Sequence, residues 1–205
     1  MYDKLISVTK PLPVTNSWER IFQSLHLAWD WPSIWNTIFS SSKNAAHQII
    51  HYKFIHNFYF TPERRFKCKL TTSDLCTICS SVKGDYLHMF WHCSSIKNLW
   101  MWIKDSVTTI IGKALPSCPA LFLIGYNPNI ALTFQDKRIL LAASTAAKKT
   151  IIKNWFEPTI NLKINWLNCF SDICLLERST ARMNGARADT IDNWSKALEA
   201  VQTIT

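Results

Sequence analysis

Two pairs of cysteine and histidine side chains constrain this chain more than any other feature, because each pair has the spacing of metal ligands. Cys76 and Cys79 are separated by two residues, so both thiolates can hold one ion from a tight turn. His88 and Cys93 follow and supply a second pair. Four protein ligands leave no coordination position for water, which is the pattern of a structural zinc site rather than a catalytic one. The fold must therefore bring these four residues to one point.

The identity of the fourth ligand is open between two neighbouring residues. His92 lies four residues after His88, so the two imidazoles would share one face of a regular helix. Cys93 lies five residues after His88 and reaches the metal only if the helix loosens or ends there. Thiolate is the softer ligand for zinc, and Ser94-Ser95 indicates a new helix start, so the sequence favours Cys93 and keeps His92 as the alternative. The other cysteines have no partner at metal spacing and are interpreted as small apolar residues: Cys68, Cys118, Cys169 and Cys174.

Apolar residues recur every three to four positions in several stretches, and this spacing indicates helices. The chain has only four glycines and few strict alternations, so a β-sandwich or barrel is not expected. Hydrophobic residues make up 48% and charged residues 18%, which is the composition of a chain that folds throughout. We predict a mostly α fold, an irregular multi-helix domain with a small zinc-knuckle-like loop.

Capping residues, prolines and glycines divide the chain into helices and segments. Helices are expected near Asn16, near Pro32, from Asn44 to Asn57, from Ser94 to Gly112, from Thr133 to about Phe156, from Thr159 to about Glu177, and through Trp194 and Leu198. The alanines of the helix after Thr133 predict close helix packing, and Lys148, Lys149 and Lys153 are expected to form its basic end. The segments are an N-terminal helical one (1–62), a basic zinc-binding one with the helix that follows (63–112), and a C-terminal helical one (113–205).

The positive charge of the chain is concentrated around the cysteines. The formal net charge is +9, and residues 43–104 hold nine lysines and arginines against three carboxylates, which gives +6. Such a field suits phosphate backbones or anionic lipid, although scattered lysines also form the solvated surface of ordinary basic proteins. The candidate contacts to nucleic acid are Arg64, Arg65, Lys67, Lys69 and Lys83 for phosphates, with Trp91 or Phe66 offering a ring for base stacking.

The sequence lacks the motifs of catalysis. It has no Gly-rich phosphate loop, no paired acidic motif for two metal ions and no spaced Ser, His and Asp set, so the chain is not expected to be an enzyme. Seven cysteines, and no apolar signal core from Met1 to Lys10, predict reduced thiols and an intracellular location, in the cytoplasm, the nucleus or both. The longest apolar runs fall far below the ~20 residues of a spanning helix, so no membrane span and no membrane partner are expected.

Several of these residues occur together in one known arrangement. They are Thr61-Pro62-Glu63-Arg64, Cys76-Thr77-Ile78-Cys79, His88-Met89-Phe90-Trp91-His92-Cys93, Ile96 with Trp100, Leu123-Ile124-Gly125, and Ala142 to Trp155 with Pro158 and Trp166. This stretch resembles the zinc-binding region near the C-terminus of reverse transcriptase polyproteins from LINE-type non-LTR retrotransposons. The resemblance implies that Cys76, Cys79, His88 and Cys93 are the metal ligands and that the region helps the polymerase to hold its RNA.

Two functions remain open on the sequence alone. The first is a zinc-containing domain of a retrotransposon reverse transcriptase that binds nucleic acid, with RNA as the expected partner, and has no catalytic activity of its own. Neither an endonuclease nor a polymerase palm lies within the 205 residues, so such a chain is a truncated element or a piece of a longer protein. The second is a zinc-stapled helical scaffold that docks on the polymerase portion of a longer parent protein. Basic residues on one exposed face beside the zinc loop favour the first function, and their pairing with carboxylates favours the second.

Overall fold

The computed structural model describes residues 13–126, 130–155 and 161–204. The described helices are α2 (Pro13–Ile21), η1 (Gln23–Leu25), α3 (Trp31–Ser40), α4 (Ala45–Ile55), α5 (Pro62–Lys67), η2 (His88–His92), α6 (Ser94–Ile111), α7 (Pro119–Ile124), α8 (Phe134–Lys153), α9 (Leu162–Met183) and α10 (Ala188–Ile204). Within these ranges the only pairing of extended backbone is one isolated bridge between Leu75 and Lys83. The prediction of a mostly α, irregular multi-helix fold is confirmed.

Three predicted helix boundaries coincide with caps in the structure. The Asn44 side chain accepts a hydrogen bond from the Ala46 N–H at the start of α4. Thr133 and Asp136 form a reciprocal capping box at the start of α8. Gly112 ends α6 with φ of 65°, in the left-handed region that glycine adopts without steric cost. Short-range capping chemistry was thus sufficient to place these ends.

Other predicted boundaries differ from the structure. Asn16 lies inside α2 rather than at its start, because the chain is already helical from Pro13. Ser94 is the first residue of α6, and Cys93 occupies the capping position that the sequence assigned to the serines. Helix α9 extends to Met183, beyond the expected end at Glu177. The predicted end near Phe156 and the predicted start at Thr159 lie outside the described residues.

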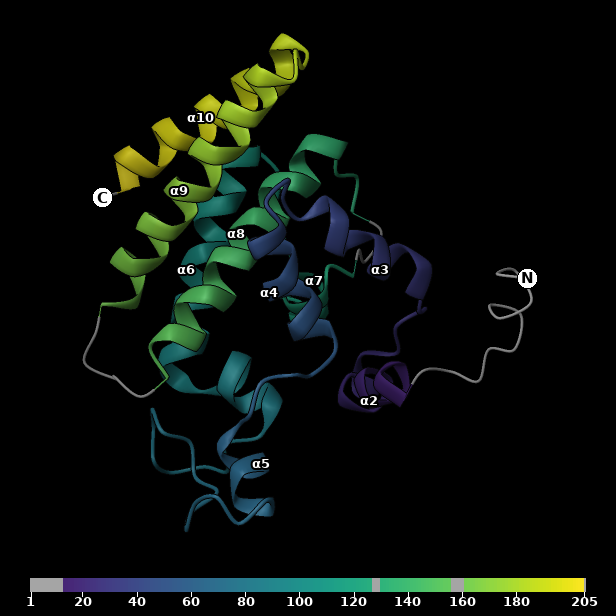
Figure 1. Ribbon diagram of the computed structural model, residues 1–205, viewed down its shortest axis with the longest axis vertical. Coiled ribbons are helices and arrows are strands. Elements are labelled where there is room, and N and C mark those ends of the chain that lie inside the picture. The colour runs from purple at the N-terminus through teal and green to yellow at the C-terminus, as the bar shows by residue number, and fades with distance from the viewer. Residues whose placement is uncertain (1–12, 127–129, 156–160, 205) are drawn as a thin grey trace.

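Helix α8 lies at the centre of the arrangement and packs against α9, α6, α4 and α7 (Figure 1). Figure 1 shows α9 and α10 side by side on one side of α8, and α5 with the loop that follows it at the lower end. Four alanines of α8 are fully buried, so neighbouring helices approach closely, as predicted: Ala142, Ala143, Ala146 and Ala147. One buried cluster contains residues from Trp18 to Val201 and so includes side chains of all three predicted segments.

Most of the tryptophans belong to this core. Trp18, Trp100 and Trp166 are each at most 2% exposed. Their indole N–H groups donate to the backbone carbonyls of Ile55, Phe90 and Ala143 at 2.7, 2.6 and 3.0 Å, respectively. Such an acceptor stabilises a buried indole, because an unpaired N–H in the interior loses its bond to water without replacement.

Glu177 of α9 is a buried carboxylate with three partners. It is 1% exposed and accepts from Ser42 Oγ at 2.5 Å, from the Lys43 N–H at 2.6 Å and from Arg138 Nη2 at 2.5 Å. These donors come from the α3–α4 connection and from α8, so one side chain ties three parts of the fold together. The partners are far apart in the sequence, and no local pattern predicts them.

Lys148 corrects the expectation of a basic end on α8, because this lysine lies in the core. Its side chain is fully buried, with Nζ 2.7 Å from His51 Nδ1 and 5.0 Å from the centre of the Phe54 ring. The other imidazole nitrogen, Nε2, is 2.8 Å from Thr37 Oγ1. Burial lowers the pKa of Lys148 and, together with the nearby lysine, that of His51. Lys153 alone of the three lysines is exposed, and Lys149 is half-buried.

Candidate metal centre

The structure brings Cys76, Cys79, His88 and Cys93 to one point. Their ligand atoms all lie within 4.8 Å of one another. The Sγ atoms of Cys76 and Cys93 are 4.0 Å apart, and Cys79 Sγ is 3.4 Å from His88 Nε2. Around a tetrahedral zinc ion with ~2.3 Å bonds to sulfur, two sulfurs are separated by about 3.8 Å. The cluster therefore has the donor set and the spacing of a four-ligand metal site.

A short hairpin carries the first ligand pair. The Cys76 N–H donates to the Val82 carbonyl and the Gly84 N–H to the Asp74 carbonyl, both at 2.8 Å, which holds the two arms together. Between the arms, the Ser80 N–H bonds the Cys76 carbonyl at 2.9 Å, and Ser80 has a positive φ of 53°. The Ile78 N–H points at Cys76 Sγ, 3.3 Å away. This tight turn places the Cys76 and Cys79 sulfurs on one side, as the two-residue spacing predicted.

A π-helical turn, η2, carries the second ligand pair. The Cys93 N–H donates to the His88 carbonyl five residues earlier at 2.9 Å, so the turn holds one residue more than an α-helical turn. Residues five apart then lie on the same side, and Cys93, with φ of −54° and ψ of 132°, already leaves the helical conformation. The sequence predicted that Cys93 could reach the metal only if the helix loosened or ended there, and the π-turn is the structural form that this loosening takes. The Asp85 carboxylate accepts from the His88 N–H at 2.7 Å and fixes the start of the turn.

His92 does not belong to the cluster. The cluster contains Cys93 as its fourth member, while the His92 side chain is exposed. The extra residue of the π-turn carries His92 past the position that it would take on a regular helix. Of the two alternatives for the fourth ligand, the geometry favours Cys93.

We expect the His92→Ala variant to retain one metal ion per chain and the Cys93→Ala variant to lose it. The first change removes an exposed side chain, whereas the second removes one sulfur of the four-atom set. Native mass spectrometry of both purified variants measures the bound metal directly. Loss of metal in His92→Ala with retention in Cys93→Ala would establish a two-Cys, two-His site instead.

The pKa values of the Cys79 and Cys93 thiols are shifted in opposite directions. Burial alone raises the pKa of the Cys79 thiol, but the Ser81 and Val82 N–H groups and His88 lower it to about 6. Burial and, next, the charge of Cys76 raise the pKa of the Cys93 thiol to about 12. Cys93 therefore gives up its proton readily only when a cation occupies the space between the sulfurs, as metal ligands do.

No protein-family model matches this chain. The metal centre is therefore assigned from the convergence of its four ligands and from the contacts that hold the two ligand-bearing turns.

The two turns are anchored to the core in different ways. Thr77 of the hairpin donates its hydroxyl to the Trp155 carbonyl at 2.6 Å. In η2, Met89 and Phe90 are fully buried, and the Trp100 indole N–H bonds the Phe90 carbonyl. The second ligand pair therefore lies on a turn that is part of the core, while the hairpin lies nearer the surface, although its Cys76 is only 1% exposed.

Trp91 does not offer a stacking face, contrary to the sequence expectation. Its side chain is 7% exposed, and its ring lies 5.4 Å from that of Trp100 and 6.0 Å from that of Phe122. Trp91 lies on the buried side of η2, and the spacing of residues in the sequence does not show which side of this turn is buried. Phe66, the other candidate, is 45% exposed.

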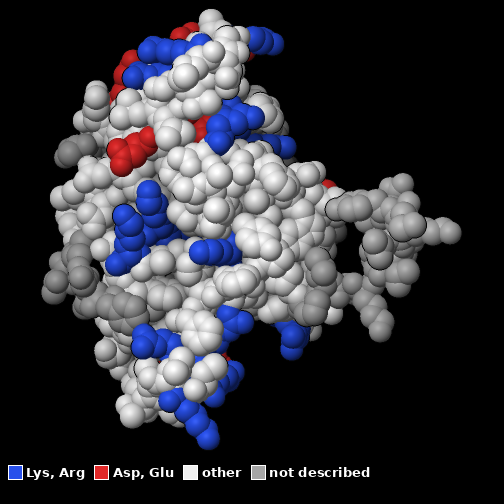
Figure 2. Space-filling view, in the orientation of Figure 1, with Lys and Arg blue, Asp and Glu red and all other residues white. Residues whose placement is uncertain are grey.

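The predicted basic residues lie beside the metal hairpin. The Glu63 N–H at the start of α5 donates to the Gly84 carbonyl at 3.2 Å. A Cβ atom on Gly84 would lie 2.8 Å from Pro62 Cγ, so only glycine allows α5 to approach the hairpin this closely. Lys and Arg side chains are visible over this lower end of the molecule (Figure 2). Helix α5 and the hairpin thus form one unit that carries the first ligand pair together with positively charged side chains.

Some of these charges have partners. Glu63 accepts from Lys67 at 2.6 Å and from Lys83 at 2.9 Å, and these hydrogen bonds lower the pKa of its carboxyl. The Arg64 guanidinium donates to the carbonyl of Asn57, which fixes the chain before α5. Lys69 is exposed, and Arg65 is half-buried in the wall of a pocket. Lys67 and Lys83 therefore lie close together at the metal hairpin, and Glu63, their common partner, offsets part of their charge.

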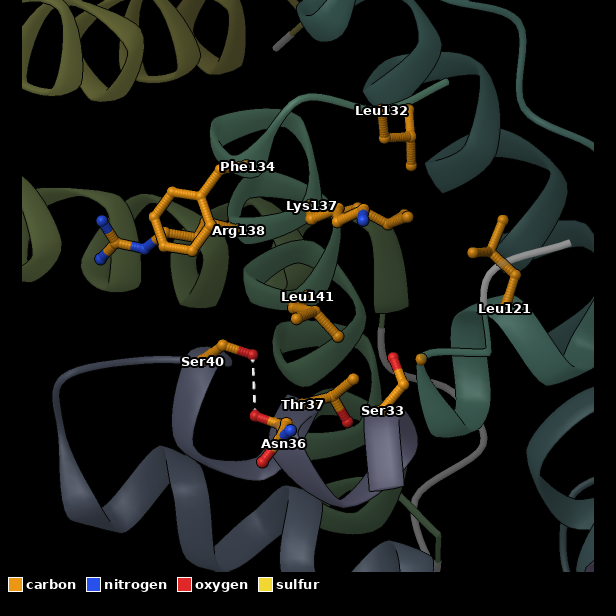
Figure 3. A pocket seen from close by; sticks show the side chains of 12 residues that line it. Ser33, Asn36, Thr37, Ser40, Leu121, Leu132, Phe134, Lys137, Arg138 and Leu141 are labelled. Atoms are coloured by element: carbon orange, nitrogen blue, oxygen red, sulfur yellow. Dashed lines mark hydrogen bonds between the residues drawn. The ribbon is translucent and has the colours of Figure 1, made fainter. Parts of the chain in front are cut away.

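A separate apolar hollow of about 160 Å³ lies between α3, α7 and α8 (Figure 3). Leu121, Leu132 and Leu141 line it, with Arg138 and the 67% exposed Phe134 at its edge. Figure 3 shows Ser33, Asn36, Thr37 and Ser40 facing it from α3. An open hollow of this kind suits a docking contact better than chemistry.

No described helix combines the length and apolar character needed to cross a membrane.

Proposed function

We propose that this chain is a zinc-containing module that binds single-stranded RNA and catalyses no reaction itself. The observation that carries the proposal is the convergence of four metal ligands from the hairpin and η2, beside exposed basic residues of α5 and the hairpin. Three thiolates and one imidazole form a soft donor set that suits zinc. Bound zinc would supply a structural cross-link between the hairpin and η2. The resemblance to the zinc-binding region of LINE-type reverse transcriptases is consistent with this role.

Exposed aromatic rings accompany the positive charge. Phe58, Phe60 and Phe66 are 62%, 50% and 45% exposed, and all three lie next to or within α5. Single-stranded nucleic acid is typically held by cations on its phosphates together with aromatic rings on which its bases stack. Both elements are present on this unit. Of these three rings only Phe66 was predicted as a contact, although the alternation Phe58-x-Phe60 before a helix cap is visible in the sequence.

The ion pairs of Glu63 do not remove this surface. One carboxylate offsets one of its two lysine partners, and the side chains of Lys67 and Lys83 are 67% and 50% exposed. Exposed ion pairs contribute little to stability, so a phosphate can compete with Glu63 for either lysine. The trio of Glu63, Lys67 and Lys83 retains a net positive charge.

Replacing Lys67, Lys69 and Lys83 together by Gln is expected to weaken RNA binding for all sequences alike. Each lysine that neutralises a phosphate of single-stranded RNA contributes about 0.7 to the slope of log affinity against log salt, so three contacts predict a decrease of about two. The measurement is a fluorescence-anisotropy titration at several salt concentrations. Arg64 is left unchanged because its guanidinium caps a backbone carbonyl.

The matched control replaces three exposed lysines of other helices and connections, Lys43, Lys137 and Lys196, by Gln. This control alters the net charge equally and should leave the salt slope close to that of the unmodified chain. Zinc content should be the same in both triple variants. An equal loss of slope in the two variants would contradict a binding surface on α5 and the hairpin.

The alternative function is a zinc-stapled scaffold that docks on another protein. The hollow of Figure 3, with the exposed Phe134 at its edge, is the observation that favours it. Unchanged RNA affinity in the Lys67, Lys69 and Lys83 variant, with zinc intact, would favour this scaffold. Binding to a separately produced polymerase portion, abolished by Phe134→Ser, would then support the docking function.

A further inference from the structure

A pocket of about 350 Å³ opens beside the metal hairpin. Its walls come from α5 and the residues on either side of it, from the hairpin, and from Trp155, which follows the end of α8. Phe60 and Leu75 form apolar walls and are 50% and 43% exposed. Thr72 and Ser73 contribute hydroxyl groups, and Trp155 contributes an indole. The volume falls in the range of sites that hold small molecules or parts of larger ligands.

The indole of Trp155 contains a donor without an acceptor. Trp155 is 6% exposed, and its Nε1 is buried without a hydrogen-bond partner among the described residues. Trp18, Trp100 and Trp166 differ, since each of their N–H groups bonds a backbone carbonyl. Trp194 also has an unpaired Nε1, but it is not part of this pocket. An unpaired buried donor is costly, and a ligand acceptor that reached it would remove the cost.

The geometry points to one unpaired nucleobase as the occupant of this pocket, an inference that rests on the proposed binding of RNA. A base is flat and aromatic, so it can stack on the exposed ring of Phe60. Its edge carries acceptors for the Trp155 N–H, and the hydroxyls of Thr72 and Ser73 can both donate and accept. A base can engage the Phe60 ring and the hydroxyls together, and its edge reaches the buried N–H once the indole turns toward the pocket, whereas an aliphatic side chain would leave that N–H unpaired.

The position of the pocket matches a strand that lies along the basic surface. Arg65 of α5 is part of the pocket wall, and Lys69 lies in the chain between α5 and Thr71, which is another wall residue. A phosphate held by Lys69 would therefore be attached to a sugar close to the pocket opening. Thr77 belongs to the same wall and bonds the Trp155 carbonyl, so the metal hairpin fixes one side of the pocket.

The test uses the full zinc-loaded chain, a labelled oligouridylate, and an oligonucleotide of equal length that lacks bases. Phe60→Leu keeps an apolar wall and removes the stacking ring, so affinity for the oligouridylate should fall about tenfold. The salt slope should not change, because no phosphate contact is lost. Affinity for the oligonucleotide without bases should be equal in the variant and the unmodified chain.

Two further variants sharpen this test. Phe60→Tyr keeps the ring and should restore the affinity for oligouridylate. Phe58→Leu is the matched control, because Phe58 is 62% exposed but is not part of the pocket, and it should bind like the unmodified chain. Trp155→Phe removes the donor and should weaken binding of the oligouridylate alone. If Trp155→Phe fails to fold, Thr72→Val tests the polar side of the pocket with an exposed residue.

The outcomes separate the pocket from the proposed function. Binding of oligouridylate that is unaffected by Phe60→Leu, yet weakened by the Lys67, Lys69 and Lys83 variant, would overturn the base pocket and leave RNA binding in place. No binding of RNA by the unmodified chain would overturn both. An equal loss of oligothymidylate affinity in Phe60→Leu would support the pocket as a site for bases of either nucleic acid. An effect of Phe60→Leu on binding to a polymerase portion, with RNA binding unchanged, would assign the pocket to a protein partner and overturn the inference.

Discussion

The Cys76→Ser variant is expected to bind no zinc and to lose, with the proposed metal ion, the ordered state of the hairpin. A hydroxyl is a poor substitute for thiolate at zinc, and structural sites of this type contribute about 10–16 kcal/mol of apparent binding free energy. Cys68→Ser is the matched control, since Cys68 is exposed and lies outside the four-residue cluster. Metal analysis of both purified variants gives the first measurement. Retention of one zinc per chain in Cys76→Ser would contradict the assigned site.

The loss of order should be confined to one side of the site. Hydrogen exchange should become fast in residues 72–84, which are held by few hydrogen bonds apart from the metal, and stay slow in α6. The π-turn should be affected less, because Met89 and Phe90 are fully buried in the core. Fast exchange throughout α6 and α8 would show instead that the metal is needed for the whole fold.

The Glu177→Gln variant is expected to destabilise the fold by about 3 kcal/mol without loss of zinc. Breaking a buried pair by removing one charge costs about 3–5 kcal/mol, and the amide keeps the shape of the side chain. Arg138, whose side chain is only 11% exposed, would keep its charge without the carboxylate, and the Lys43 N–H would lose a charged acceptor. Urea unfolding followed by circular dichroism measures the difference in free energy.

Glu199→Gln serves as the control for this change. Glu199 is exposed on α10, so its replacement alters the net charge equally but should change the free energy of unfolding by less than about 0.5 kcal/mol. An equal stability of the two variants would mean that the hydrogen bonds from Ser42, Lys43 and Arg138 to Glu177 contribute no stability through the charge of the carboxylate.

The parts of the fold that sequence predicted well depend on neighbours along the chain. Asn44, Thr133 and Gly112 act on backbone groups within a few residues, and these three ends were correct. The two-residue spacing of Cys76 and Cys79 likewise predicted their convergence, because both lie in one turn of the hairpin. Such contacts do not require knowledge of how the helices pack.

The choice between Cys93 and His92 could not be made from helical periodicity. A regular helix would place His92 on the side of His88, whereas the π-turn places Cys93 there. Ligand softness favoured the cysteine for a chemical reason, and the structure supplies the geometry that permits it. Trp91 shows the opposite case, since its position in a metal motif suggested exposure and its packing on Trp100 and Phe122 removes it from solvent.

Contacts between distant residues were beyond the sequence analysis. Glu177 and Lys148 are charged residues within helices, and charged side chains usually lie on the protein surface. Their burial follows from partners such as Ser42 and His51, which are distant in the chain. The pocket beside the hairpin has the same origin, because Phe60 and Trp155 meet only after α8 has packed against the metal unit.

The π-turn also determines where this chain can change its length. Inserting one residue into Met89–His92 would place Cys93 six residues after His88, where neither an α-helical nor a π-helical turn brings the two side chains to the same side. The connection around Leu70 has no such restriction, since Leu70 is 62% exposed and lies between α5 and the hairpin. An insertion at Leu70 is therefore compatible with the geometry of the four ligands, while an insertion within η2 is not.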